Sequence, residues 1–379
     1  MSKTVAATPV PLLDLGRVHR SIAAELKQDF ERVLASGQFI LGPEHDAFER
    51  ELAEACGVRH AVGLSSGTSA ITLAVEALGI GSGDEVILPA FTYHATASAV
   101  AQAGARPVFA DVEPVRFGLD ASSVEARIGS RTRAILPVHL YGLACDLDGL
   151  AALAERHGLA ILEDAAQAIG ATRNGIAPGK SGAGATLSFF PTKNLGALGD
   201  AGAFVTERED LAGRVRLLRA QGDAGNYRHT EIGTNARLDS LQAAFLRTKL
   251  RHLPGWVEAR REAASRYRIA LSDVPVTLPA EPSDSRHTYH QFTIRTRDRD
   301  RLKEFLHERG VATRIYYPIP LHQQPCFAGM GHRAGDFPVA EALAREVLSL
   351  PIFPGITEEE IARVTDAVRE FFEARPGGA

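Results

Sequence analysis

An alternation that begins near residue 57 constrains the fold most strongly: short apolar runs are separated by longer stretches rich in Ala and Leu. The short runs suit strands, and the longer stretches have the length and composition of helices. Such alternation is typical of βαβ units, so it predicts an α/β fold with a mainly parallel sheet. The expected strands are Ala61–Leu64, Glu85–Pro89, Pro107–Ala110, Ala134–Val138, Leu159–Glu163, Thr186–Phe190 and Ala203–Thr206, and the expected helices include Ser69–Leu78, Ala95–Ala103, Leu147–His157 and Glu209–Arg219.

The pattern changes after Ala236, where LDSLQAAFLRTKLRHL carries apolar residues at helical spacing. Pro254 and Gly255 are expected to interrupt this helix before a second, charged one, VEARREAASRYRIAL. Beyond it, YHQFTIR predicts a strand, RLKEFLHERG predicts a helix closed by Gly310, and two more helices are expected around LPIFPG. A chain of 379 residues has room for two domains. We expect residues 1–236 to form a large domain with N-terminal helices, and residues 237–379 to form a bridging helix and a smaller α+β domain.

Composition excludes several classes of protein. Lys and Arg total 42 against 46 Asp and Glu, without a long block of like charge, so bulk binding to nucleic acid is not expected. Cys56, Cys145 and Cys326 lack the paired spacing of a metal or redox site and suit reduced thiols. Neither the segment MSKTVAATPVPLLDLGR nor any later stretch has an apolar run suited to a signal peptide or a membrane span, which requires about 20 residues. A cytoplasmic protein with no membrane partner and no metal is expected.

One lysine stands out in SFFPTKNLGALGDAGAF, where Lys193 follows an apolar strand within a stretch of small residues. It does not lie on an amphipathic face, where a solvated lysine is usual. By itself the segment is equally compatible with an ordinary loop lysine, so the neighbouring motifs decide its interpretation.

Asp164 follows an apolar strand in LAILEDAAQAIGA, which places it at the carboxyl edge of an open α/β sheet, where ligands bind. A carboxylate buried there needs a partner, although an ordinary helix cap is the alternative. A pyridine nitrogen is a suitable partner, because a carboxylate keeps it protonated and able to accept electrons.

A third motif, AVGLSSGTSAITLAV, predicts a strand, a Ser/Gly turn and a helix that begins near Gly67 and Thr68. Exposed amides at a helix N-terminus bind phosphate well, although Ser-Gly-Thr is also common capping chemistry. The chain lacks the Gly-Lys-Ser/Thr of a Walker loop, and GIGSGD lacks the spacing of a dinucleotide fingerprint.

Together these motifs resemble the DegT/DnrJ/EryC1/StrS family of sugar aminotransferases that depend on pyridoxal 5'-phosphate (PLP). The resemblance covers nearly the whole chain, and the motifs occur in order and at the family's spacing. They are ASGQFILGPE, SSGTSA, GIGSGDEVILPAFTYHAT, PVHLYG, EDAAQAIGA, SFFPTKNLGALGD, NARLDSLQAAFLRTKL and YYPIPLH.

The resemblance implies the aspartate-aminotransferase fold (PLP fold type I) and an obligate homodimer with shared active sites. It implies that Lys193 forms the Schiff base with PLP and that Asp164 pairs with the pyridine nitrogen. The other cofactor positions implied are Gly67, Thr68 and Ser188 at the phosphate, Tyr93 on the ring face, Gln167 near the ring hydroxyl, and Asn235 reaching the neighbouring subunit's phosphate. Plain packing or local hydrogen bonding remains an alternative for Tyr93 and Ser188.

Four further positions match residues that often line the family's sugar pocket: Tyr227, His229, Tyr317 and His322. Solvated or packed roles remain open for all four. The chain departs from the family where Gly199-Asp200-Ala201-Gly202 replaces Gly-Asp-Gly-Gly and where Tyr316-Tyr317-Pro318 replaces His-Tyr-Pro. The second departure leaves a sugar contact at position 316 in doubt.

The function implied is transfer of an amino group from an amino acid, usually glutamate in this family, to a nucleotide-linked keto-deoxysugar. NARLDSLQAAFLRTKLRHL and YYPIPLHQQPCF look more like the branch that aminates C3 than the branch that aminates C4. A sugar dehydratase of the same fold is a rival, but that branch has histidine at the position of Lys193. A non-catalytic PLP-binding regulatory protein is a third hypothesis. The presence of Lys193, Asp164 and the phosphate turn together argues against it.

Overall fold

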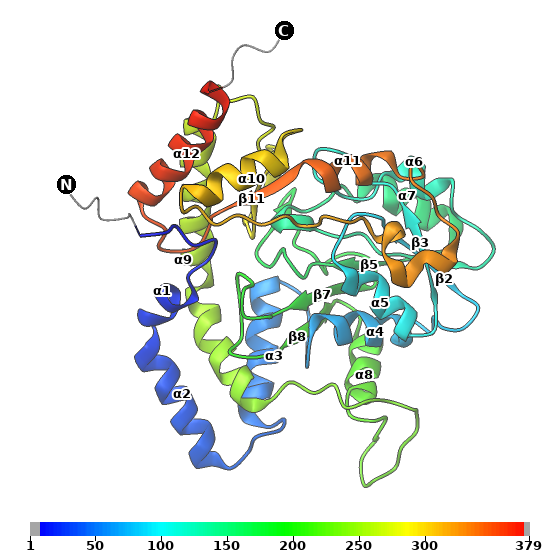
Figure 1. Cartoon of the computed structure of the whole chain (residues 1–379). Coiled ribbons are helices and arrows are strands. Elements are labelled where there is room, and N and C mark those ends of the chain that lie inside the picture. The colour runs from blue at the N-terminus through cyan, green and yellow to red at the C-terminus, as the bar shows by residue number, and fades with distance from the viewer. Residues whose placement is uncertain (1–7, 375–379) are drawn as a thin grey trace.

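A computed structural model describes residues 8–374 (Figure 1). Its main sheet has seven strands in the order β1-β8-β7-β5-β4-β2-β3. Only β8 runs against its neighbours, so the sheet is mainly parallel, as predicted. The expectations for residues 1–7 and 375–379 lie outside the described residues. The seven strands are β1 (His60–Leu64), β2 (Glu85–Pro89), β3 (Arg106–Ala110), β4 (Thr132–Ile135), β5 (Ala160–Asp164), β7 (Gly184–Ser188) and β8 (Gly202–Thr206).

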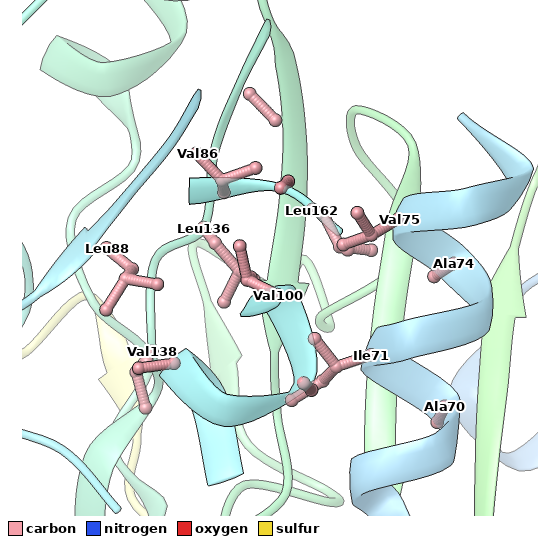
Figure 2. Packing of buried hydrophobic residues seen from close by; sticks show 14 of the residues in the cluster. Ala70, Ile71, Ala74, Val75, Val86, Leu88, Val100, Leu136, Val138 and Leu162 are labelled. Carbon is pink, nitrogen blue, oxygen red and sulfur yellow. The ribbon is translucent and has the colours of Figure 1, made fainter. Parts of the chain in front are cut away.

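Alternate residues of a strand point to opposite faces of the sheet. Because apolar residues lie on both faces, helices cover both of them. Val86, Leu88 and Leu162 face one layer of helices, whereas Ile87 and Ile161 face the other. The first layer contains α4 (Gly67–Ala77), α5 (His94–Gln102) and α8 (Glu209–Leu218), and Figure 2 shows side chains of α4 directed at this side of the sheet. The second contains α3 (Pro43–Cys56), α6 (Ala121–Glu125), α7 (Asp148–His157) and part of α9 (Ser240–Ala270).

The helix α9 corrects one expectation, because it runs unbroken through Pro254 and Gly255. Both residues are exposed, so solvent can satisfy the carbonyl that the missing proline amide leaves free. The flanking residues Leu253 and Val257 are buried. Tertiary packing on both sides therefore holds a helix that local sequence alone would break.

A second apolar core lies at the far end of α9 and includes Tyr267 of that helix. Around it pack β10 (Phe292–Arg295) and β11 (Val347–Leu350), which pair antiparallel, with α10 (Arg299–Glu308) and α12 (Glu358–Glu373). Gly310 takes a left-handed φ of 70° just after α10, where the sequence predicts its end. The domain division at residues 236 and 237 stays a prediction.

The remaining elements are short or peripheral. They are α1 (Leu15–Arg20), α2 (Ala23–Ser36), α11 (Pro338–Glu346), the paired strands β6 (Thr172–Arg173) and β9 (Ser285–Arg286), and 3₁₀ turns at Leu140–Gly142, Leu321–Gln323 and Pro325–Met330. No helix within residues 8–374 is both long and apolar enough to cross a bilayer. The three cysteines form no disulfide.

Candidate active site

Most of the predicted cofactor residues lie at one edge of the sheet, at or beyond the ends of β1, β2, β5 and β7. Register fixes this arrangement: Gly202, the first residue of β8, pairs with Leu64 at the end of β1 and with Ser188 at the end of β7. Asp164 ends β5, next to β7 in the sheet. Residues far apart in sequence thus meet at the carboxyl edge, where open α/β sheets bind ligands.

The turn after β1 has the geometry of an anion seat. The Ser66 hydroxyl accepts from the Ser69 amide at 3.0 Å and Ser69 caps Ser66 in return, which starts α4 at Gly67. The Gly67 and Thr68 amides belong to the first turn, where α-helix amides lack intrahelical partners. A Cβ atom on Gly67 would lie 2.8 Å from Ser188 Cβ, and one on Gly202 would overlap the Ser66 carbonyl group. Glycine at both positions therefore lets three segments close around the seat.

Asp164 is 4% exposed and has two hydrogen-bond donors. Its Oδ2 accepts from Thr96 Oγ1 of α5 at 2.8 Å, and its Oδ1 accepts from the Ala166 amide at 3.0 Å. The second bond is a local turn of the kind that the capping alternative requires, whereas the first comes from another element and orients the carboxylate. Two donors leave acceptor capacity on the carboxylate for a third.

Lys193 lies in the turn that follows β7, where its amide donates to the Phe190 carbonyl at 2.8 Å. Burial of the ammonium group lowers the pKa of Lys193 to about 8, and the negative charge of Asp164 acts in the opposite direction. An amine with that pKa is partly neutral near physiological pH. It can therefore act as a nucleophile or carry a proton.

Gln167 is fixed by two hydrogen bonds, one on each side of its amide. Its Oε1 accepts from the Tyr141 amide at 2.7 Å, and its Nε2 donates to the Tyr317 hydroxyl at 3.0 Å. The Tyr317 ring lies 5.7 Å from the Tyr93 ring, centroid to centroid. Burial raises the pKa of Tyr317 above its usual range, so its hydroxyl remains protonated. Gln167, Tyr317 and Tyr93 thus form a connected wall beside Asp164.

The remaining predicted residues come from the segment before α9 and from the 3₁₀ turn at Leu321–Gln323. Asn235 is exposed before α9, and its Oδ1 accepts from Arg237 Nε at 3.1 Å. Tyr227 is 92% exposed and His229 is also exposed, in the loop before Asn235. His322 is buried, with its Nε2 3.1 Å from Glu341 Oε1 and its ring against Phe337. This environment suits the packed alternative for His322, and the sugar-contact roles stay predictions.

Two residues that the sequence motifs contain but do not single out also belong to the site. Thr96, in the TYHAT motif, donates to Asp164. Tyr141, in the LYG motif, orients Gln167 through its backbone. In the sequence, the only local signal for Thr96 was a threonine three residues after Tyr93, and a backbone contact leaves no signal in side-chain identity.

The arrangement fits PLP on its own geometry. The glycine-lined helix N-terminus suits the phosphate, the oriented Asp164 suits a pyridinium nitrogen, the Tyr93 ring suits the face of an aromatic ring, and Lys193 suits the aldehyde. Fold and site together define a PLP-dependent aminotransferase with the aspartate-aminotransferase fold.

The chain belongs to the DegT/DnrJ/EryC1/StrS aminotransferase family, whose model matches residues 20–369. It is 46% identical to the dTDP-3-amino-3,4,6-trideoxy-alpha-D-glucose transaminase of Streptomyces venezuelae, over 98% of this chain and 99% of that protein. It is also 46% identical to a protein of Geobacillus stearothermophilus named pleiotropic regulatory protein, over 96% and 98% of the two chains. A crystal structure of S. venezuelae DesV in complex with a ketimine intermediate superimposes with a TM-score of 0.95 at 46% identity, covering 97% of this chain and 100% of that chain.

Proposed function

We propose that this aminotransferase moves the amino group of an amino acid, glutamate being the favoured donor, to C3 of a nucleotide-linked keto-deoxysugar. The main support for this proposal is that Lys193, Asp164 and the glycine-lined phosphate turn lie together at one edge of the sheet. The 46% identical S. venezuelae relative, named for a 3-amino sugar, supports a nucleotide sugar and amination at C3. Amination at C4 is the alternative.

Each residue has a distinct task in this proposal. PLP, when bound, supplies the electron sink that lets the bond between the donor α-carbon and its hydrogen break. Lys193 would hold the cofactor through its Nζ, and its amine, with a lowered pKa, would move the proton at the donor α-carbon. Asp164, oriented by Thr96, holds the ring nitrogen protonated, and Gly67, Thr68 and Ser188 bind the phosphate. Tyr93 covers the ring face, and Gln167 approaches the ring hydroxyl.

The proposal also includes a cytoplasmic homodimer with shared sites, in which Asn235 reaches the partner's phosphate. Large apolar side chains are exposed near the site at Tyr93, Phe190 and Leu198, and on the loop before Asn235, where Ile232 is 98% exposed. A protein interface would remove these apolar side chains from water. Because Arg237 Nε donates to Asn235 Oδ1, the amide nitrogen of Asn235 stays free to donate to an anion.

A borohydride experiment tests the anchor. Reduction of the yellow holoenzyme is expected to fix the cofactor to the peptide that contains Lys193. Recovery of the cofactor on another lysine, or on none, contradicts the assignment.

A substrate panel tests the acceptor. The enzyme is incubated with glutamate and matched nucleotide-linked 3-keto and 4-keto deoxysugars, and NMR locates the nitrogen in the product. Nitrogen at C3 supports the proposal, whereas amination only at C4 overturns the position and leaves the chemistry of Lys193 intact. Dehydration without amino transfer favours the dehydratase alternative. Absence of turnover with every amino donor and sugar favours a regulatory protein.

A further inference from the structure

A small cavity lies beside Lys193, between the turn that carries this lysine and two segments that take no part in the site described above. Its volume is about 20 Å³, which suits one atom-sized guest. The walls come from the segment around His19, the turn that carries Lys193 and Asn194, and the helix α9 through Lys249 and Arg260. Four of the lining side chains can carry positive charge, and none of the lining residues is an Asp or a Glu.

Lys249 is a deeply buried cation without a carboxylate partner among the described residues. It is 2% exposed, and its Nζ lies 2.6 Å from the Gly196 carbonyl oxygen and 2.9 Å from His19 Nε2. Burial lowers the pKa of Lys249 to about 8, and both burial and the charge of Lys249 lower the pKa of His19. At neutral pH Lys249 therefore remains mostly charged.

Arg260 is a second buried cation of the same kind, at 3% exposure. Its Nη1 donates to three backbone carbonyls, at Tyr289, His290 and Ile352, and it forms no ion pair with a described residue. Its Nε has no hydrogen-bond partner. Burial lowers the pKa of Arg260 only to about 10, so the guanidinium stays charged. An unpaired buried charge with an unused donor is costly unless an acceptor of opposite charge is near.

We propose that this cavity binds one small monovalent inorganic anion of the size of chloride or bromide, held by Lys249 and Arg260 next to Lys193. The anion supplies the negative charge that the lining residues lack and an acceptor for Arg260 Nε. Asn194, which also lines the cavity, has a buried Oδ1 without a donor, so water, which can both donate and accept, is the competing occupant. Charge distinguishes the two occupants: water satisfies the hydrogen bonds and leaves the cations uncompensated.

An anion at this position would act on the lysine of the proposed function. The other groups that influence this region are Asp164, which favours the protonated Lys193, and His290, whose pKa lies well below its usual range because of burial and the charges of Lys193 and Arg260. Adding a negative charge beside these groups favours the protonated form of the nitrogen of Lys193. The anion therefore raises the pH at which the lysine-bound cofactor loses its proton.

Crystals of the holoenzyme grown without halide and soaked in sodium bromide test the site directly. An anomalous bromide peak between Lys249 and Arg260 is expected. A water in the cavity, with bromide absent or bound only elsewhere, overturns the proposal. This readout does not depend on the role of Lys193, so it stays informative if the borohydride label falls on another residue.

A spectroscopic titration tests the consequence, and this part rests on the proposed role of Lys193. The absorbance band of the lysine-bound cofactor is followed against pH in sodium chloride and in sodium gluconate at equal ionic strength. The midpoint is expected to lie about one pH unit higher in chloride. Equal midpoints in an enzyme whose borohydride label falls on Lys193 contradict the proposed effect of the anion.

Lysine variants separate this cavity from other halide sites near the cofactor. In Lys249→Met we expect no bromide peak. About tenfold more chloride should be required to reach half of the shift in the spectroscopic midpoint. Lys249→Arg keeps the charge and is expected to keep the halide response. The matched control is Lys180→Met, which removes an exposed lysine paired with Glu207. A chloride response unchanged in Lys249→Met, or equally reduced in Lys180→Met, overturns the assignment to this cavity.

Discussion

At the scale of single residues, Asp164 should control the electron sink without controlling the fold. Asp164→Asn keeps the volume and the Thr96 contact but removes the charge, so we expect kcat to fall by about a hundredfold or more, and Asp164→Ala to be at least as poor. Thr96→Val removes the orienting hydrogen bond, together with the contact to the Thr92 hydroxyl, and should lose much less. Circular dichroism and cofactor content serve as controls. Near-normal turnover of Asp164→Asn at saturating cofactor would show that the carboxylate is only a local cap.

The same scale carries a pH prediction for Lys193. Because burial lowers the pKa of Lys193 to about 8 from an ordinary 10.5, its neutral amine is populated at lower pH than that of a solvated lysine. The rate at which apoenzyme recombines with PLP should therefore rise through pH 8 and level off by about pH 9. Stopped-flow absorbance measures this rate, and N-acetyl-lysine corrects for titration of PLP itself. A rate that still climbs steeply near pH 10 would contradict the lowered pKa.

At the scale of elements, one glycine should decide how β8 meets α4. A Cβ on Gly202 overlaps the Ser66 carbonyl group and the Gly67 amide nitrogen, so Gly202→Ala should push the strand away from the phosphate turn. We expect weaker cofactor binding, by about tenfold or more, measured by fluorescence titration of the apoenzyme. Ala201→Gly, which restores the family's usual residue next to it, is the matched control and should bind PLP normally. Equal affinity of Gly202→Ala and wild type would show that the contact can relax.

The helix α9 gives a stability prediction at this scale. Proline in a helix interior costs about 3 kcal/mol, and Pro254 is exposed within an unbroken helix. Pro254→Ala should therefore raise the free energy of unfolding, by about 1–3 kcal/mol, in urea titrations at fixed protein concentration. Gly255→Ala should add a smaller gain. A loss of stability in Pro254→Ala would mean that the proline shapes the packing of α9 rather than merely being tolerated.

At the scale of the whole molecule, the shared-site proposal predicts complementation between inactive subunits. A dimer of one Lys193→Ala chain with one Asn235→Ala chain should contain one site that lacks both residues and one that has both. We expect activity to return toward a quarter of wild type on mixing, since about half of the dimers are mixed and each has one complete site. Subunit exchange is verified with differently tagged chains. Activity that stays at the parental levels despite exchange would contradict a site that spans two subunits.

The sequence determined most of the local structure and the chemical identity of the site. Periodicity predicted all seven strands of the main sheet, with bounds that differ by a few residues, because alternation of apolar residues reflects burial directly. The motifs around Lys193, Asp164 and Gly67 indicated the cofactor class, because each chemical task needs a particular side chain at a strand end or helix start.

Tertiary structure alone decided features that depend on contacts between distant segments. Packing on both sides of Leu253 and Val257 kept α9 continuous where proline and glycine predicted a break. Strand register placed Gly202 between the ends of β1 and β7. Gly202 therefore has a role in closing the phosphate turn that its neighbour Ala201 does not share. Lys249 and Arg260 resemble surface cations in the sequence, and only the folding of the N-terminal segment and the Lys193 turn onto α9 buries them. Burial and proximity are properties of the packed chain, so no local pattern encodes them.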